Sequence, residues 1–348
     1  MDLKNTEKFI KDKLNEELFG SYAVLVSING NEKLITSPDV DKDTYFDVAS
    51  MTKVLSTSTL ALKAISLKKL NLEDTLDMFF DFDLGDKSKI KIKNLLTHTS
   101  GIVRYKGIDN EISKKGKDEV AKFILSFPLA FKTGTNEKYF CNGMILMGFI
   151  LEKIFGIPLD MAFEKYIKEP LLLTRSKFNI LWDEENAVNS YRWKEVTKYR
   201  VDDEQANALG GVAGNAGAFF TICDIQKFIS AILRKDEALY SKELFDIAEK
   251  NYTPNFENGR GLGYLVVNEN YSQTGNLFPP GSFGHCGHSG TSFFINRKLN
   301  LYAVILTNAT RYLNIRSGFK GYNYGIVTKM REDIHNEILK DLKEQNLL

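Results

Sequence analysis

The chain of 348 residues is 43% hydrophobic, and its charge is almost balanced, with 46 Lys and Arg against 45 Asp and Glu. This apolar content is enough for one large domain or for two that share an interface, and it excludes a disordered or fibrous protein. Balanced charge provides no single-sign field to attract nucleic acid or an anionic membrane. We therefore expect a small-molecule or peptide substrate and no nucleic acid.

The N-terminal residues and the cysteines indicate the cellular compartment. The first 17 residues hold nine charged side chains and lack the apolar stretch of a signal peptide. The longest strongly apolar run, residues 144–151, is less than half as long as a membrane-spanning helix. Three cysteines are few for a disulfide framework. We expect a cytoplasmic protein without a transmembrane segment or structural disulfide, and the sequence predicts no oligomeric state.

The first residues predict a helix followed by a hairpin. Within residues 5–18, apolar side chains recur at four-residue spacing among charges, which is typical of a helix with one buried stripe. Residues 22–28 are β-branched and aromatic, and residues 33–36 can return after a turn at Asn29-Gly30.

The middle of the chain is mostly helical, and strands return toward the end. Helical patterns cover residues 52–70, 119–127, 142–155 and 224–233. Alternating patterns cover residues 262–267, 292–296 and 301–307, before a last amphipathic helix at residues 326–342. We expect an α/β (α+β) fold with one antiparallel sheet built from both chain ends and flanked by helices. The predicted domains are a discontinuous sheet domain, 1–55 with 240–348, and a helical domain, 56–239, with the site in a cleft between them.

The first chemical motif is Ser50-Met51-Thr52-Lys53, at the start of a predicted helix. Positions i and i+3 lie on one face of a helix, so the Lys53 amine can reach the Ser50 hydroxyl. A serine in the first helical turn also lies where free N–H groups favour developing negative charge. The alternative is an exposed serine followed by a surface lysine, because this spacing also occurs by chance.

A second motif, LLTHTSGI at residues 95–102, adds to the first. By itself, His98 is typical of a structural histidine, and Ser100-Gly101 of a turn after a helix. Together with the upstream SxxK, however, the string resembles the serine hydrolase superfamily of class C β-lactamases, penicillin-binding carboxypeptidases and related esterases. The resemblance implies the β-lactamase-like form of the expected fold.

Three further motifs, and the strand that follows the last of them, resemble this family in the same order along the chain. Gly134-Thr135 followed by Tyr139 is similar to the second family box, and residues 209–217, which contain Asn215, resemble its glycine-rich stretch. Residues 283–291 resemble the third box, which elsewhere reads KTG or HTG, and residues 301–308 resemble the strand that follows it. Five motifs in family order are a far more specific signal than any one of them.

The resemblance implies acyl transfer through an acyl-enzyme intermediate, without a cofactor or metal. Ser50 would attack a carbonyl, with Lys53 and Tyr139 sharing the general-base and general-acid roles, because an unassisted hydroxyl is a weak nucleophile. His285 would begin the third box. The backbone N–H groups of Ser50 and His288 would form the oxyanion hole. In this interpretation, glycine at position 287 lets the strand approach the substrate closely.

Two protonation schemes for the base remain open. In one, Lys53 acts as the base, which requires a pKa well below about 10. In the other, Lys53 stays charged and holds Tyr139 as a phenolate by its field.

The sequence also departs from the family. Cys141 stands where the family has asparagine or aspartate, and Asn142 lies one position later. Either Cys141 is a poor replacement, or the turn presents Asn142 to the substrate, which puts amide-bearing substrates in doubt. Asn215 stands where close relatives often have histidine. His285 stands where a strong β-lactamase has lysine, and an unperturbed histidine is mostly neutral near pH 7. We therefore expect weak carboxylate recognition, with ester or peptide hydrolysis favoured over efficient β-lactam hydrolysis.

Other classes of function have less support. His285-Cys286-Gly287-His288 contains zinc-ligand types, but adjacent residues of a strand point to opposite faces. The glycines at 210–217 lack the Lys-Ser or Lys-Thr of a phosphate loop. The remaining rival is a non-catalytic sensor of cell-wall peptides or penicillins on the same fold, although such a sensor would not need Ser50, Lys53 and Tyr139 together.

Overall fold

The computed structural model describes residues 1–180, 186–191, 201–269 and 273–348. In these ranges a seven-stranded sheet has the order β2-β1-β10-β9-β8-β7-β6, with antiparallel neighbours throughout. Its strands are β1 (Tyr22–Ile28), β2 (Asn31–Thr36), β6 (Gly259–Arg260), β7 (Leu265–Val266), β8 (Phe283–Cys286), β9 (Ser292–Asn296) and β10 (Leu301–Thr307). A second sheet, which the sequence did not predict, joins β3 (Phe46–Asp47), β5 (Ala218–Phe220) and β4 (Lys177–Phe178).

The large sheet is built from both ends of the chain, which confirms the expected fold class. Strand β1 pairs along its whole length with β10, from Tyr22 opposite Thr307 to Ile28 opposite Leu301. Both strands begin and end at the predicted residues. Residues 262–267, by contrast, form only the two-residue strand β7, next to β6.

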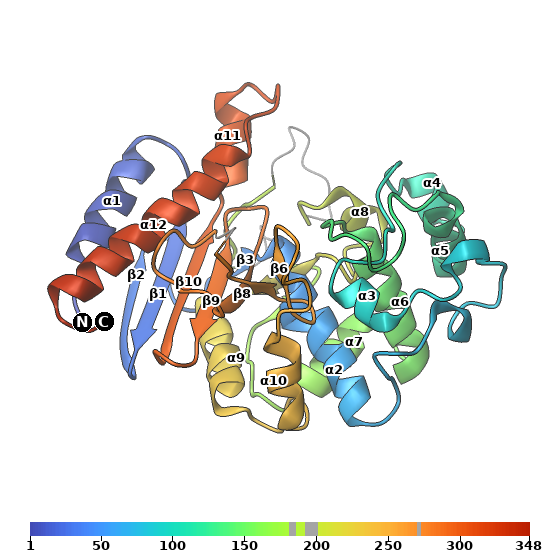
Figure 1. Ribbon diagram of the computed structural model, residues 1–348. Helices are drawn as coiled ribbons and strands as arrows, with labels where there is room; N and C mark the ends of the chain where they lie inside the picture. Colours follow the sequence, from blue (N-terminus) through green and yellow to red (C-terminus); the bar gives the residue numbers. More distant parts are fainter. Residues whose placement is uncertain (181–185, 192–200, 270–272) are drawn as a thin grey trace.

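The described ranges contain twelve α-helices, some packed beside this sheet and others in a separate helical region (Figure 1). They are α1 (Lys4–Asn15), α2 (Thr59–Ser66), α3 (Ile92–Leu96), α4 (Asn110–Ser113), α5 (Lys117–Ser126), α6 (Asn142–Phe155), α7 (Leu159–Phe163), α8 (Glu204–Ala208), α9 (Ile222–Arg234), α10 (Glu243–Glu249), α11 (Ala309–Arg316) and α12 (Gly325–Glu344). None of the helices in the described part of the chain is long and apolar enough to cross a membrane.

Each face of the sheet contributes to a different core. On β1, Val24 and Val26 pack in the cluster that contains α1 and α12, whereas Ala23 and Leu25 pack in the larger cluster that contains α9 and the helical region. Alternate residues of a strand point to opposite faces, so burial of both faces explains why this strand is apolar at almost every position. Figure 1 shows α1 and α12 side by side, with the two termini together.

In Figure 1 the helical region lies on the β6 side of the sheet, away from α1 and α12. Its central helix α6 begins and ends where the sequence predicted and contacts α2, α3 and α7. The domain boundaries after residues 55 and 239 remain our proposal for how the chain divides.

The helix expected at residues 52–70 has a different local structure. A 3₁₀ turn (Ala49–Met51) is followed by a π-helical segment (Lys53–Ser58) and then by α2. The reason lies in the hydroxyl groups of Thr57 and Thr59, which bond to backbone carbonyls. Thr59 donates to the carbonyl of Val54, five residues back, and Thr57 donates to the carbonyl of Gly214 in the glycine-rich segment. Such π segments are frequent at functional sites.

Candidate active site

Ser50 lies in a tight turn at the end of β3. The preceding residue, Ala49, has a positive φ of 47°, which is uncommon for a residue with a Cβ atom. The buried carboxyl group of Asp47 accepts a hydrogen bond from the Ala49 N–H at 2.8 Å and from the Asp202 N–H at 3.0 Å. This carboxyl group therefore holds the turn that presents the Ser50 hydroxyl to the pocket.

Lys53 is fully buried beside Ser50. Its Nζ donates to Ser50 Oγ at 2.8 Å and to the backbone carbonyl of Asn215 at 2.9 Å. Burial lowers the pKa of the Lys53 amine, but negative charge on Cys141 and Tyr139 raises it, and the resulting pKa lies above the usual value. The two oxygen atoms accept two of the three hydrogen bonds that an ammonium group can donate. The strongly lowered lysine pKa required by the first protonation scheme is therefore not what this environment produces.

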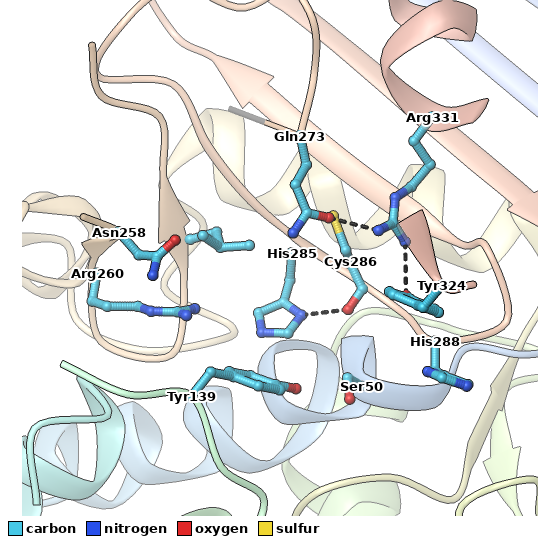
Figure 2. Close-up of a pocket in the computed structure, with 11 residues that line it drawn as sticks. Ser50, Tyr139, Asn258, Arg260, Gln273, His285, Cys286, His288, Tyr324 and Arg331 are labelled. Atoms are coloured by element: carbon cyan, nitrogen blue, oxygen red, sulfur yellow. Dashed lines mark hydrogen bonds between the residues drawn. The ribbon is translucent and has the colours of Figure 1, made fainter. Parts of the chain in front are cut away.

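Tyr139 directs its hydroxyl toward Ser50 (Figure 2). Its ring lies between two cations, with Lys53 Nζ 5.0 Å and Arg260 Cζ 5.2 Å from the ring centroid. The His98 ring packs on it, with centroids 4.7 Å apart. Burial raises the pKa of the phenol and the Lys53 ammonium lowers it, which leaves the pKa above its usual value. At neutral pH, both members of the Lys53–Tyr139 pair therefore hold their protons.

His285 is buried at the end of β8 and faces the same pocket. Burial, followed by the charges of Lys53 and Arg260, holds its pKa well below the usual value, so the imidazole is neutral. Its Nδ1 lies 2.8 Å from the carbonyl oxygen of Cys286, which assigns the proton to Nδ1. The Nε2 atom then carries a lone pair that can accept a hydrogen bond.

The turn after β8 brings Gly287 against the Ser50 turn. A Cβ atom at position 287 would lie 2.5 Å from the Val48 carbonyl oxygen and 2.0 Å from Thr291 Oγ1. The glycine thus permits contact between the strand and the turn, and its close approach to the substrate stays a prediction. His288 follows on the pocket wall, with its ring stacked on Tyr324 at a centroid distance of 4.6 Å.

Two of the expected substrate-binding side chains face away from the pocket. Asn142 is the first residue of α6, where its buried amide donates to the Val103 carbonyl. Asn142 does not line the pocket in this structure, and the alternative in which the turn presents it to the substrate stays a prediction. Asn215 is fully buried and its amide donates to Asp203, so this residue reaches the site only through its backbone carbonyl on Lys53. Cys141 lies at the start of α6, close enough to Lys53 to influence its pKa.

The pocket contains polar residues that the motifs did not indicate. It has a volume of about 290 Å³ and is lined by Ser50 and Tyr139 together with Asn258, Arg260, Gln273 and Arg331 (Figure 2). The fully buried Arg331, from α12, donates to the Gly287 carbonyl at 2.9 Å and to Gln273 at 2.6 Å. Two arginines therefore supply guanidinium groups near the neutral His285. Neither lies in a recognisable motif, so only their place in the fold could reveal them.

Comparison with known proteins identifies the family. The family model for β-lactamase matches residues 7–316. The chain therefore belongs to the β-lactamase family, whose members include serine hydrolases. It is 28% identical to a putative D-alanyl-D-alanine carboxypeptidase of Escherichia coli O157:H7, over 76% of this chain and 69% of the relative. It is 26% identical to an N-acetylmuramyl-L-alanine amidase of Bacillus subtilis strain 168, over 83% and 73%.

Comparison with solved structures gives a similar fold. A class C β-lactamase mutant superposes with a TM-score of 0.74 at 18% sequence identity, covering 96% of both chains. This likeness shows the fold, and the family model shows the membership.

Proposed function

We propose that the protein is a serine hydrolase that forms an acyl-enzyme intermediate on Ser50. The observation that supports this most directly is the 2.8 Å hydrogen bond between the buried Lys53 ammonium and Ser50 Oγ. A buried lysine whose amine touches a serine hydroxyl at a pocket has the arrangement needed to activate a nucleophile. Tyr139 and His285 face the same pocket and provide further proton-transfer and hydrogen-bonding groups.

The proposed reaction begins when the Lys53–Tyr139 pair loses one proton. The pair then accepts the Ser50 proton while Oγ attacks the substrate carbonyl, and the backbone N–H groups of Ser50 and His288 stabilise the oxyanion. The tetrahedral intermediate collapses, and the leaving group takes the proton from the pair. In deacylation, a water molecule attacks the acyl-enzyme carbonyl while the Lys53–Tyr139 pair accepts its proton. The second tetrahedral intermediate then collapses, Ser50 Oγ takes the proton back from the pair, and the acid is released.

We further propose that an ester or a peptide is a better substrate than a β-lactam. His285 supplies no positive charge at the position where lysine would, because its pKa is lowered. The relatives named as a carboxypeptidase and an amidase are consistent with cleavage of peptide-like bonds. The remaining alternative is a sensor that becomes acylated without turnover.

Labelling of Ser50 tests the proposal. A fluorophosphonate should add its mass to the wild-type protein and not to Ser50→Ala, as read by intact mass spectrometry. Turnover of ester and D-peptide substrates after labelling would support the enzyme, and a stable penicillin adduct without turnover would support the sensor. Absence of any label would contradict both.

A further inference from the structure

A buried ion pair forms one wall of the pocket. Arg260, on β6, donates from Nε to Glu137 Oε1 at 2.7 Å, with side chains that are 5% and 1% exposed. Asn258 donates from its amide to the other carboxylate oxygen, Oε2, at 2.8 Å. Both oxygens of Glu137 therefore have partners, and the guanidinium is held in one orientation.

One donor of this group is unused. Among the residues that the structure describes, Nη1 of Arg260 is buried and has no hydrogen-bond partner. Such a group is rare in folded proteins because a buried donor without an acceptor is costly. Figure 2 shows the Arg260 guanidinium pointing over the Tyr139 ring into the pocket, toward His285. An acceptor atom of a bound ligand is the partner that this position lacks.

The position of Arg260 assigns the acceptor to one part of the substrate. In the proposed reaction the leaving group takes its proton from the Lys53–Tyr139 pair, so it must lie against the Tyr139 hydroxyl. Arg260 lies over the ring of the same tyrosine, 5.2 Å from its centroid. The oxyanion groups of Ser50 and His288 are elsewhere on the pocket wall (Figure 2). The acceptor therefore belongs to the leaving group.

The carboxylate of Glu137, which pairs with Arg260, favours a neutral acceptor at Nη1. Glu137 offsets the charge of Arg260, and a ligand carboxylate at Nη1 would lie close to the Glu137 carboxylate, with which it would repel. The Asn258 amide, whose nitrogen is committed to Glu137, keeps its oxygen as an acceptor, and His285 Nε2 is a second acceptor. A donor site beside acceptor sites is complementary to an amide group, which carries both a carbonyl oxygen and an N–H.

We propose that Arg260 is a specificity-determining residue that binds a neutral amide carbonyl in the leaving group of the substrate. The proposal rests on the proposed function, because it concerns the same pocket. The proposal predicts that the cleaved bond is followed by a further amide, as within a peptide chain. It does not predict a cleaved bond that is followed by a free carboxylate.

Three esters of one carboxylic acid test the proposal, with glycolamide, glycolate and propanol as leaving groups. In Arg260→Lys, the ratio of kcat/KM for the glycolamide ester to that for the propyl ester should fall about tenfold or more. Lysine has one nitrogen in place of the planar guanidinium fork, which holds one nitrogen on Glu137 and directs another at the ligand. Intrinsic differences between the leaving groups cancel in this comparison of ratios. With the wild-type protein, kcat/KM for the glycolate ester should not exceed kcat/KM for the glycolamide ester.

A matched control is Arg297→Lys, which alters another partly buried arginine that donates to Glu249 at 2.7 Å and lies outside the pocket. It should leave the ratio unchanged. If Arg260→Lys does not fold, Arg260→Leu combined with Glu137→Leu removes both charges together and should give the same loss. An unchanged ratio in the folded Arg260 variant, or a preference for glycolate that the variant loses, would overturn the proposal.

Binding separates this inference from the proposed function. Calorimetric titration of the glycolamide ester into Ser50→Ala, which cannot be acylated at position 50, should give a Kd about tenfold lower than in Ser50→Ala with Arg260→Lys. Equal Kd values would contradict the role of Arg260. Wild-type protein without Ser50 labelling or turnover would contradict the proposed function, whereas a difference in Kd would still support the Arg260 contact.

Discussion

The Lys53 ammonium lies 2.8 Å from Ser50 Oγ and is buried completely. Its other oxygen partner is the carbonyl of Asn215, so the amine joins the turn that carries Ser50 to the glycine-rich segment. Because the amine is fixed from both sides, its position does not depend on a bound substrate.

Removal of this amine should abolish most of the acylation. We expect Lys53→Met to slow Ser50 acylation by roughly 10²-fold to 10⁴-fold, the range typical of a lost general base. Stopped-flow or mass-resolved labelling measures the rate. Lys63→Met is the control, because Lys63 lies in the following helix and donates to the Ala238 carbonyl. A similar loss in both variants would indicate disruption of the helix instead of lost proton transfer.

The pH dependence of acylation should rise toward alkaline pH. Tyr139 and Lys53 both have pKa values above their usual ones, so the fraction of the pair that has lost one proton increases about tenfold per pH unit in the neutral range. We expect log kcat/KM to rise with a slope of about one from pH 7 to pH 9. The lowered pKa of His285 means that its protonation should add no transition near pH 6.5. A plateau that begins below pH 7 would contradict this assignment.

Substitution of Tyr139 by phenylalanine should alter both the rate and the profile. We expect Tyr139→Phe to lower kcat/KM by about 10²-fold or more, because one partner of the proton-transfer pair is lost. The midpoint of the remaining profile should move to higher pH, because only the Lys53 amine can then lose the proton that either member of the pair could lose in the wild type. An unchanged rate and profile would remove Tyr139 from the mechanism.

Asp47 should make the stability of the protein depend on pH. Burial raises the pKa of its carboxyl group from 3.8 to about 7. Between these two pH values the folded state holds a proton that the unfolded state has lost, so stability falls as the pH rises from about 4 to about 7. The contribution amounts to roughly 4 kcal/mol at most.

Urea unfolding of the wild type and of Asp47→Asn at pH 4, 5, 6, 7 and 8 measures this contribution. The substitution forfeits the acceptor for the Asp202 N–H, so it should destabilise the protein at acidic pH by about 1 kcal/mol. As the pH rises, the free energy of unfolding of the wild type should fall relative to that of Asp47→Asn. A difference that stays constant with pH would contradict the raised pKa.

Alanine at position 287 should separate the third-box strand from the Ser50 turn. Its Cβ atom would contact the Val48 carbonyl and Thr291, so we expect a loss of about 1–3 kcal/mol in the free energy of unfolding, together with reduced acylation. Gly143→Ala is the control, because a Cβ atom there meets only ordinary contacts, the nearest 3.6 Å away on Leu95, and alanine favours the helix. Equal stability of the two variants would show that the strand can move away without cost.

The sequence by itself determined the strands that form the sheet from both chain ends, the helix α6 and the family motifs. Periodicity was sufficient for these elements because β1, β10 and α6 are buried along most of their length, and local pattern then agrees with global packing. It did not determine the π-helical segment after Ser50, where hydroxyl groups bond to the backbone of distant segments.

Only the tertiary structure decided how the site is lined. Arg260 comes from a two-residue strand, Glu137 from the loop before Tyr139, and Arg331 from the last helix, and no local pattern connects them. The same holds for Asn142, whose amide faces Val103, and for the Lys53 pKa, which depends on groups brought together by folding. Spacing along the chain fixes which residues share a helix or a strand, whereas contacts between distant segments fix which side chains meet and which protons they hold.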